Sequence, residues 1–185
     1  MADDYNGIAL RALSFGKDLY KKSKNVVLKV SEIEAKVKEA TNSEAWGPSG
    51  TVLNDISAAT TDDQQKAIIL STLWERLREP AHNWRKVYKA LNVLEYCVKN
   101  GTRRFVEDVR DNVDRIEDCQ RFNFIEADTG KDVGLNVREK SKVLAELLLN
   151  TEKLAEEREK ARRARDRFHH GGSGAGSDDF CSRSG

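Results

Sequence analysis

The sequence predicts an all-α protein, folded as a right-handed superhelix of about eight short helices. Only two of its 185 residues are prolines, and long stretches consist mainly of Ala, Leu, Glu, Lys and Arg, which favour helices. Apolar residues recur at intervals of three and four, without the alternation typical of strands. Hydrophobic residues make up 38% of the chain, enough for one sizeable core. We therefore expect one domain over residues 15–168, between a flexible leader (1–14) and a flexible Gly- and Ser-rich tail (169–185).

Residues 15–30 form a basic amphipathic segment. At helical spacing the apolar stripe consists of Phe15, Leu19, Val26 and Val30, and a basic stripe consists of Lys17, Lys21 and Lys24. Such a segment lies in a membrane interface with its apolar side down. Burying the stripe is offset by the cost of ordering the backbone, so we expect this helix to fold only when an anionic headgroup joins its cations. The alternative is a terminal helix that packs on the core.

Capping patterns and turns divide the first half of the chain. Ser31–Glu34 and Thr61–Gln64 each fit a capping box and mark two helix starts. A turn at 46–50 precedes a short helix expected over 51–59. Pro80 either ends the helix that Thr61 opens or starts the next turn. Its apolar positions are Ile68, Ile69, Leu73, Trp74 and Leu77.

The second half is divided in the same way. The next helix is expected to end near Lys99, where Asn100-Gly101 supplies a left-handed C-cap, and another helix begins near Thr102. A polar turn at 128–134 then precedes a further helix. The expected apolar positions are Phe105, Val109, Val113 and Ile116 in the first of these two helices and Val143, Leu144, Leu147 and Leu148 in the second. Residues 151–168 predict an exposed helix with the ion pairs Glu156–Lys160 and Glu159–Arg163.

The run from Trp84 to Leu91 combines a buried helix face with cations. Its apolar face, expected in the core, consists of Trp84, Val87, Tyr88 and Leu91. Lys86 and Lys89 are the expected contacts of an anion, whereas Arg85 has no assigned role. Because 34% of the residues are charged but the net charge is only +1, any basic surface must arise by sorting charges between faces.

The residue types present argue against several classes of protein. Three cysteines without CxxC spacing argue against a disulfide framework and a zinc site, and we expect neither a metal nor a cofactor. Catalytic motifs are missing, so an enzyme is not expected. Apolar runs fall short of the roughly 20 residues of a membrane-spanning helix, and the acidic start is unlike a signal peptide, so we expect a cytoplasmic protein. The Arg162–Arg165 run lacks aromatic partners for bases, so a nucleic-acid partner is not expected.

Three blocks of sequence resemble one family. They are Glu39–Asn42 together with Trp46–Pro48, then Asn83–Leu91, then Gly130–Lys140. In this order they are similar to the epsin N-terminal homology (ENTH) domain, and the resemblance covers roughly Phe15 to Phe168. It implies a phosphoinositide-binding superhelix of clathrin-mediated endocytosis and vesicle trafficking. It also implies that the amphipathic N-terminal helix inserts into the cytoplasmic leaflet and promotes membrane curvature.

The same resemblance implies a headgroup site and an insertion surface. The implied headgroup-binding residues are Lys21, Lys24, Lys38, Arg76, His82, Lys86 and Lys89. The implied membrane-inserting residues are Phe15, Leu19, Val26 and Val27. Among the cations, Arg76 can engage a phosphate through two parallel N–H bonds.

Five positions depart from the pattern of plasma-membrane epsins, namely Tyr20, Ser23, Ser43, His82 and Lys86. These departures leave phosphatidylinositol 4-phosphate as a competitor of phosphatidylinositol 4,5-bisphosphate. The longer leader and Asn25–Val27 are more similar to the epsin-related proteins of the Golgi and endosomes. The expected location is therefore peripheral, on clathrin-coated vesicles of the plasma membrane, endosome or Golgi.

A second hypothesis makes the helical stack a platform for protein partners. A SNARE or a ubiquitylated cargo protein would bind it, and lipid contact would be incidental. Clathrin and clathrin adaptors would bind through regions outside this chain, although Asp178–Phe180 faintly resembles an adaptor-binding DxF peptide. A monomer is expected.

Overall fold

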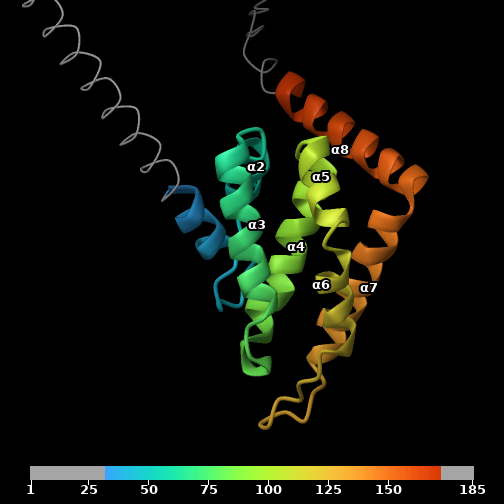
Figure 1. Cartoon of the computed structure of the whole chain (residues 1–185). Coiled ribbons are helices and arrows are strands. Elements are labelled where there is room, and N and C mark those ends of the chain that lie inside the picture. Colours follow the sequence, from blue (N-terminus) through green and yellow to red (C-terminus); the bar gives the residue numbers. More distant parts are fainter. Residues whose placement is uncertain (1–31, 172–185) are drawn as a thin grey trace, which may run out of the picture.

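The structure, a computed structural model, describes residues 32–171, with side chains through residue 167, and confirms the all-α class. Residues 32–40 are helical, and seven further α-helices follow in this described part. Their bounds are α2 Gly50–Ala59, α3 Asp63–Leu77, α4 Trp84–Asn100, α5 Arg103–Arg110, α6 Val113–Glu117, α7 Gly134–Leu149 and α8 Thr151–Gly171. Two short 3-10 helices, η1 (Ala81–Asn83) and η2 (Asp118–Arg121), join α3 to α4 and end the α6 segment. The helices stack one after another along the molecule (Figure 1).

Helix α4 lies at the centre of the stack and contacts α2, α3, α5, α7 and α8 (Figure 1). Because neighbours surround it, α4 is apolar over much of its circumference. Its fully buried residues are Val87, Ala90, Leu91, Val93, Leu94, Cys97 and Val98. Trp84 and Tyr88, also expected in the core, are only partly buried and pack against its edge. The core therefore forms around α4, and the N-terminal turn of α4 is left near the surface.

Two predicted helix starts shift by one residue. The N-cap of α3 is Asp62, not Thr61, because the Asp62 carboxylate accepts from the backbone N–H groups of Gln64 and Gln65 at 2.9 and 3.0 Å. The helix dipole also stabilises a negative charge at this position. Helix α2 starts one residue before the expected range, since Ser49 caps it by accepting from Val52 N at 3.3 Å. The start predicted at Ser31 lies outside the described residues.

The junction of α4 and α5 differs from the expected left-handed cap. Gly101 has φ −81°, a conformation open to any residue. Glycine is needed there for space, because a Cβ would lie 2.6 Å from the carbonyl oxygen of Cys97 and 2.9 Å from Thr60 Oγ1. Thr102 caps α5, as predicted, with its Oγ1 accepting from Phe105 N at 3.3 Å. The junction is thus a close contact between two chain segments.

The helix expected after Thr102 is divided, since α5 ends at Arg110 and α6 starts at Val113. The break leaves the predicted stripe inside, with Phe105, Val109 and Ile116 fully buried. On α7 the prediction for Val143 is wrong, because this side chain is 46% exposed. The α7 stripe is narrower than expected. Its three other members, Leu144, Leu147 and Leu148, are buried as predicted.

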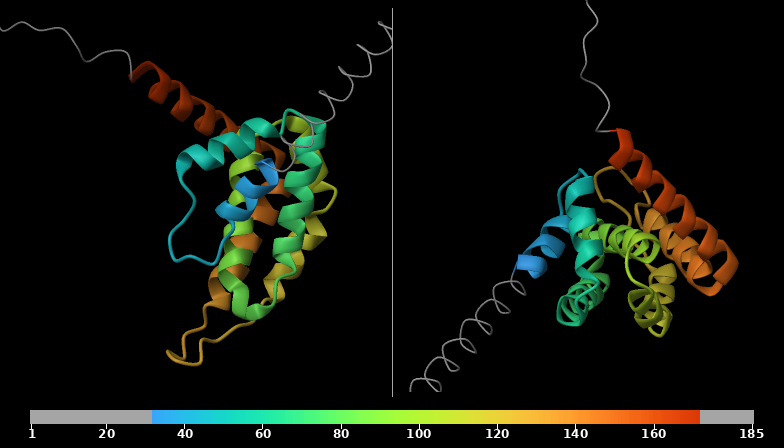
Figure 2. Two further views of the ribbon diagram at one scale, coloured as in Figure 1. Left: turned by 90° about the vertical axis from the view of Figure 1, so that its left-hand side faces the viewer. Right: turned by 90° about the horizontal axis from the view of Figure 1, so that it is seen from above.

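Helix α8 crosses the C-terminal end of α4 and then extends past the other helices (Figure 2). The Arg158 guanidinium donates to the carbonyl oxygens of Val98 and Gly101, the latter at 2.6 Å. These bonds satisfy orphan carbonyls at the end of α4. Of the predicted surface pairs, Glu159–Arg163 is present at 3.0 Å. Lys160 pairs with Glu157 at 2.9 Å instead of the predicted Glu156; both acids lie within one helical turn of it.

No helix within residues 32–171 is both long and apolar enough to cross a bilayer.

Candidate functional site

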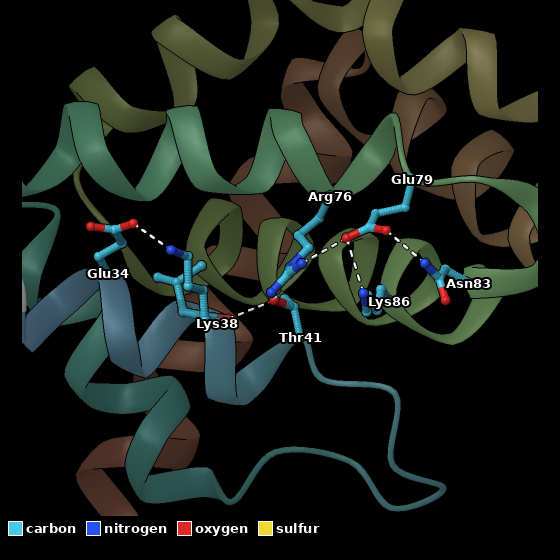
Figure 3. Close-up of polar contacts among 8 residues, drawn as sticks. Glu34, Lys38, Thr41, Arg76, Glu79, Asn83 and Lys86 are labelled. Carbon is cyan, nitrogen blue, oxygen red and sulfur yellow. Dashed lines mark hydrogen bonds and ion pairs between the residues drawn. The ribbon is translucent and has the colours of Figure 1, made fainter.

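Cations from three segments of the chain lie near the junction of α3 and α4. Lys38 comes from the last turn of helix 32–40, Arg76 from the last turn of α3, and Lys86 from the first turn of α4 (Figure 3). Pro80 and the short helix η1 reverse the chain between α3 and α4. The reversal places the end of one helix beside the start of the next.

Glu79 lies at the centre of this group. Its Oε1 accepts from Arg76 Nη1 at 2.7 Å and from Lys86 Nζ at 3.2 Å, and its Oε2 accepts from Asn83 Nδ2 at 2.7 Å (Figure 3). The Glu79 side chain is only 18% exposed. Burial would raise the pKa of Glu79, but the bonds from Asn83, Arg76 and Lys86 outweigh burial and hold this pKa below its ordinary value. We refer to Arg76, Glu79, Asn83 and Lys86 as the Glu79 cluster.

Arg76 is also fixed from its other side. Its Nε donates to Thr41 Oγ1 at 3.1 Å, and the Thr41 hydroxyl donates in turn to the carbonyl oxygen of Val37 at 2.7 Å (Figure 3). Thr41 is fully buried, so this relay is shielded from water. Within the described part of the chain, Arg76 Nη2 has no hydrogen-bond partner, which leaves its N–H groups available to an anion.

The Lys38 side chain lies outside the Glu79 cluster. Its ammonium group pairs with Glu34 at 2.6 Å, one helical turn away, and its side chain is 51% exposed (Figure 3). An exposed pair of this kind contributes little to stability. Lys38 is therefore free to exchange Glu34 for another anion.

Lys89 makes no hydrogen bond to Glu79, although the sequence groups it with Lys86; its partner is Asn42, the residue after Thr41. Lys89 is only 6% exposed and donates to Asn42 Oδ1 at 2.6 Å. Burial is the main reason why its pKa lies below the ordinary value; nearby Glu44 raises it and Arg85 lowers it. Its ammonium group borders a cavity of about 260 Å³ beneath the loop that carries Trp46. The structure thus gives Lys86 and Lys89 separate surroundings.

The other predicted site residues fall into two groups. His82 is exposed on η1, next to the Glu79 cluster. The remaining headgroup and insertion residues lie outside the described residues: Lys21, Lys24, Phe15, Leu19, Val26 and Val27.

Arg85, which had no predicted role, stacks over the Trp84 ring at 4.7 Å and pairs with Glu126 at 3.9 Å. It thereby ties the start of α4 to the loop before α7.

Sequence reasoning missed Glu79, Thr41 and Asn83. Thr41 stands in one of the blocks that carry the family resemblance, which was a signal for it. Glu79 lies three residues after Arg76, a spacing that is equally typical of an ordinary helix ion pair. Among the residues that the structure describes, no three His, Cys, Asp or Glu side chains are grouped to hold a metal ion.

Comparison with known proteins identifies the family. The family model for the ENTH domain matches residues 30–154, which include helix 32–40 and the whole Glu79 cluster. The chain therefore belongs to the ENTH domain family.

Relatives of known name agree with this assignment. The chain is 38% identical over 173 residues to Epsin-3 of Saccharomyces cerevisiae, covering 93% of this chain and 42% of that protein. It is 39% identical over 153 residues to human Clathrin interactor 1, covering 82% of this chain and 24% of that protein. The chain thus spans less than half the length of these relatives.

Solved structures give the same fold. The human epsinR ENTH domain matches with a TM-score of 0.68 and 40% identity, covering 71% of this chain and 97% of that one. The epsin-2 ENTH domain in complex with phosphatidylinositol 4,5-bisphosphate matches with a TM-score of 0.66 and 33% identity, covering 69% and 89%.

Proposed function

We propose that this chain is a phosphoinositide-binding module of a clathrin-associated membrane adaptor, and not an enzyme. The observation that carries the proposal is the Glu79 cluster, in which Arg76 and Lys86 converge on one carboxylate oxygen while Arg76 Nη2 stays available. Two cations held this close are suited to a phosphate group, which accepts several charge-assisted hydrogen bonds. The complex of epsin-2 with phosphatidylinositol 4,5-bisphosphate supports the choice of ligand.

In this mechanism the described residues form one half of the headgroup site. A phosphate accepts from Arg76 Nη2 and from the remaining N–H groups of Lys86, while Lys38 leaves Glu34 to reach a second phosphate. Lys89 lies deeper and adds positive potential beneath the Asn42 loop. His82 lies at the rim, where its ring N–H could donate to a phosphate.

Lys21 and Lys24 would supply the other half of the headgroup site. Their segment directly precedes helix 32–40, the helix that carries Lys38 in its last turn. Once the headgroup holds these lysines, Phe15, Leu19, Val26 and Val27 would enter the cytoplasmic leaflet as the apolar side of a new helix. We propose that this coupling makes membrane attachment conditional on the lipid.

Vesicle sedimentation with a panel of phosphoinositide isomers tests the proposal, together with the helicity gained on binding. Wild type should sediment with phosphatidylinositol 4,5-bisphosphate or 4-phosphate, and Lys24→Glu with Arg76→Glu should abolish sedimentation. The control is Lys153→Glu with Arg104→Glu, which makes the same charge change at exposed positions on α8 and α5. Equal sedimentation of both double variants would contradict the proposal.

A groove favours a second candidate function, the binding of a protein partner. It lies between α2, α4 and α8, has a volume of about 900 Å³ and includes Ala58, Tyr96, Ala161 and Ala164 in its walls. Lys99 and Arg165 add positive charge to it. A SNARE or ubiquitylated cargo protein could dock there. Cargo binding that survives in the lipid-blind double variant and is lost in Ala161→Glu would favour this function.

We extend the proposal to the partners, oligomeric state and location of this chain. Human Clathrin interactor 1 is named for an interaction with clathrin, and this chain covers only 24% of that relative. We propose that clathrin and its adaptors bind outside the described helices, and that the domain acts as a monomer, peripherally on plasma membrane, endosome or Golgi vesicles. The Asp178–Phe180 peptide is a candidate adaptor contact.

A further inference from the structure

Glu79 places a negative charge inside a site built for anions. Its carboxylate accepts three hydrogen bonds, from Arg76, Asn83 and Lys86, and so joins the two cations and the amide of the Glu79 cluster. Both of its oxygens are occupied, and the side chain is largely buried. The carboxylate therefore already acts as the counter-anion of Arg76 and Lys86.

An incoming phosphate meets two obstacles at this position. It must share Arg76 and Lys86 with Glu79, and it must approach a carboxylate of like charge. Like charges brought together across an interface suppress unwanted partners. A headgroup with at most one phosphomonoester group gains only the unused N–H groups of the two cations, whereas a headgroup with two also gains Lys38, which lies outside the Glu79 cluster.

We infer that Glu79 is a specificity-determining residue, an internal counter-anion that disfavours headgroups with at most one phosphomonoester group relative to headgroups with two. The inference rests on the proposed function and adds a cause for its selectivity. It requires that the Glu79 charge, and not only its hydrogen bonds, controls binding.

Glu79→Gln separates charge from hydrogen bonding. The amide oxygen of glutamine can still accept from Arg76 and Lys86, and Asn83 can turn its own amide to accept from the new NH₂ group. The variant thus keeps the bonds of the Glu79 cluster and removes its negative charge. Glu107→Gln, an exposed position on α5, makes the same change in net charge away from the cluster and is the matched control.

The test is the affinity of the full chain for vesicles that contain phosphatidylserine, phosphatidylinositol 4-phosphate or phosphatidylinositol 4,5-bisphosphate at equal total lipid charge. We expect Glu79→Gln to strengthen binding to the first two by about tenfold and to the bisphosphate by about threefold or less, so that selectivity falls. Glu107→Gln should leave all three affinities within about twofold of wild type.

The outcomes separate this inference from the proposed function. If wild type binds none of the phosphoinositide vesicles, the proposed function fails. If wild type binds but Glu79→Gln weakens binding to all three vesicles or leaves selectivity unchanged, Glu79 only positions the cations and the inference is overturned. If Glu79→Gln does not fold, Glu79→Asp is the second variant. It keeps the negative charge, but its shorter side chain holds the carboxylate farther from Arg76 and Lys86. It should then raise affinity for the monophosphate by about threefold, and a loss for every lipid would overturn the inference.

Discussion

At the scale of single residues, a buried hydroxyl supports the whole site. Thr41 accepts from Arg76 Nε and donates to the Val37 carbonyl oxygen, so it joins the end of helix 32–40 to the end of α3. Each of these bonds adds only modestly to the free energy of unfolding. Losing one destabilises the fold by more, because the buried donor is then left without a partner and without water. The position of the Arg76 guanidinium thus depends on a residue that carries no charge.

Thr41→Val, which keeps the shape of the side chain, should lower the free energy of unfolding by about 1–3 kcal/mol. It should also weaken phosphoinositide binding, because Arg76 loses one of its two anchors. Urea denaturation and vesicle sedimentation measure the two effects. Ser43→Ala, at an exposed position in the same loop, is the control and should change neither.

Sequence alone named Arg76 and Lys86 but not the residues that hold them. The structure brings these two cations together on Glu79, and their headgroup role stays a prediction. The burial of Lys89 was not predictable, because its partner Asn42 lies 47 residues away and only the packed fold joins them. Glu79 could not be recognised from the sequence, because its spacing from Arg76 fits an ordinary surface ion pair as well as a site residue.

At the scale of elements, contacts between helix ends restrict which residues can stand there. The end of α4 meets the end of α2 at Gly101, where Thr60 Oγ1 accepts from Thr102 N at 3.1 Å and Thr102 Oγ1 donates to Thr60 O at 3.1 Å. The left-handed cap expected there is a common solution for a helix end, but close packing between helices decides the residue instead. Sequence periodicity predicts helices well and contacts between their ends poorly.

Gly101→Ala should destabilise the fold by about 1–3 kcal/mol, because its Cβ would overlap the Cys97 carbonyl oxygen and Thr60 Oγ1. Thermal and urea denaturation measure this loss. Gly47→Ala introduces the same methyl group where no atom lies within 4 Å. An equal loss in both variants would show that backbone freedom, and not space, requires glycine at 101.

The contact of α8 with α4 depends on Arg158. Arg158→Met keeps the length of the side chain but leaves the carbonyl oxygens of Val98 and Gly101 without their donor. We expect a loss of about 2–3 kcal/mol and faster hydrogen exchange in residues 151–167. Arg162→Met removes an exposed arginine that pairs with Glu159 and should have little effect. Unchanged exchange in Arg158→Met would contradict this role.

At the scale of the whole molecule, an ion network links three helices. Glu95 on α4 binds Lys140 on α7 and, at 3.0 Å, Lys99, which in turn binds Glu157 on α8 at 3.1 Å. Burial would raise the pKa of Glu95, but the bonds from Lys140 and Lys99 outweigh it and keep this pKa below 4.5. The network therefore stabilises the stack of α4, α7 and α8 only while Glu95 is ionised.

This network predicts a pH dependence of stability. Below pH 4.5 the unfolded chain binds a proton at Glu95 more readily than the folded chain, so stability present above that pH is lost as the pH falls through the lower folded pKa. Glu95→Gln should be less stable than wild type at pH 7, and the difference should shrink below pH 4.5. Urea denaturation at a series of pH values measures it. A difference that does not change with pH would contradict the assignment.

An NMR titration of the full chain with soluble inositol 1,4,5-trisphosphate shows whether the Glu79 cluster binds the headgroup. We predict that the largest saturable amide shifts occur at Thr41, Arg76, Glu79 and Lys86, and that Arg76→Gln removes them. Saturable shifts centred instead on the groove of Tyr96 and Ala161, or no saturable shift at any concentration, would contradict it.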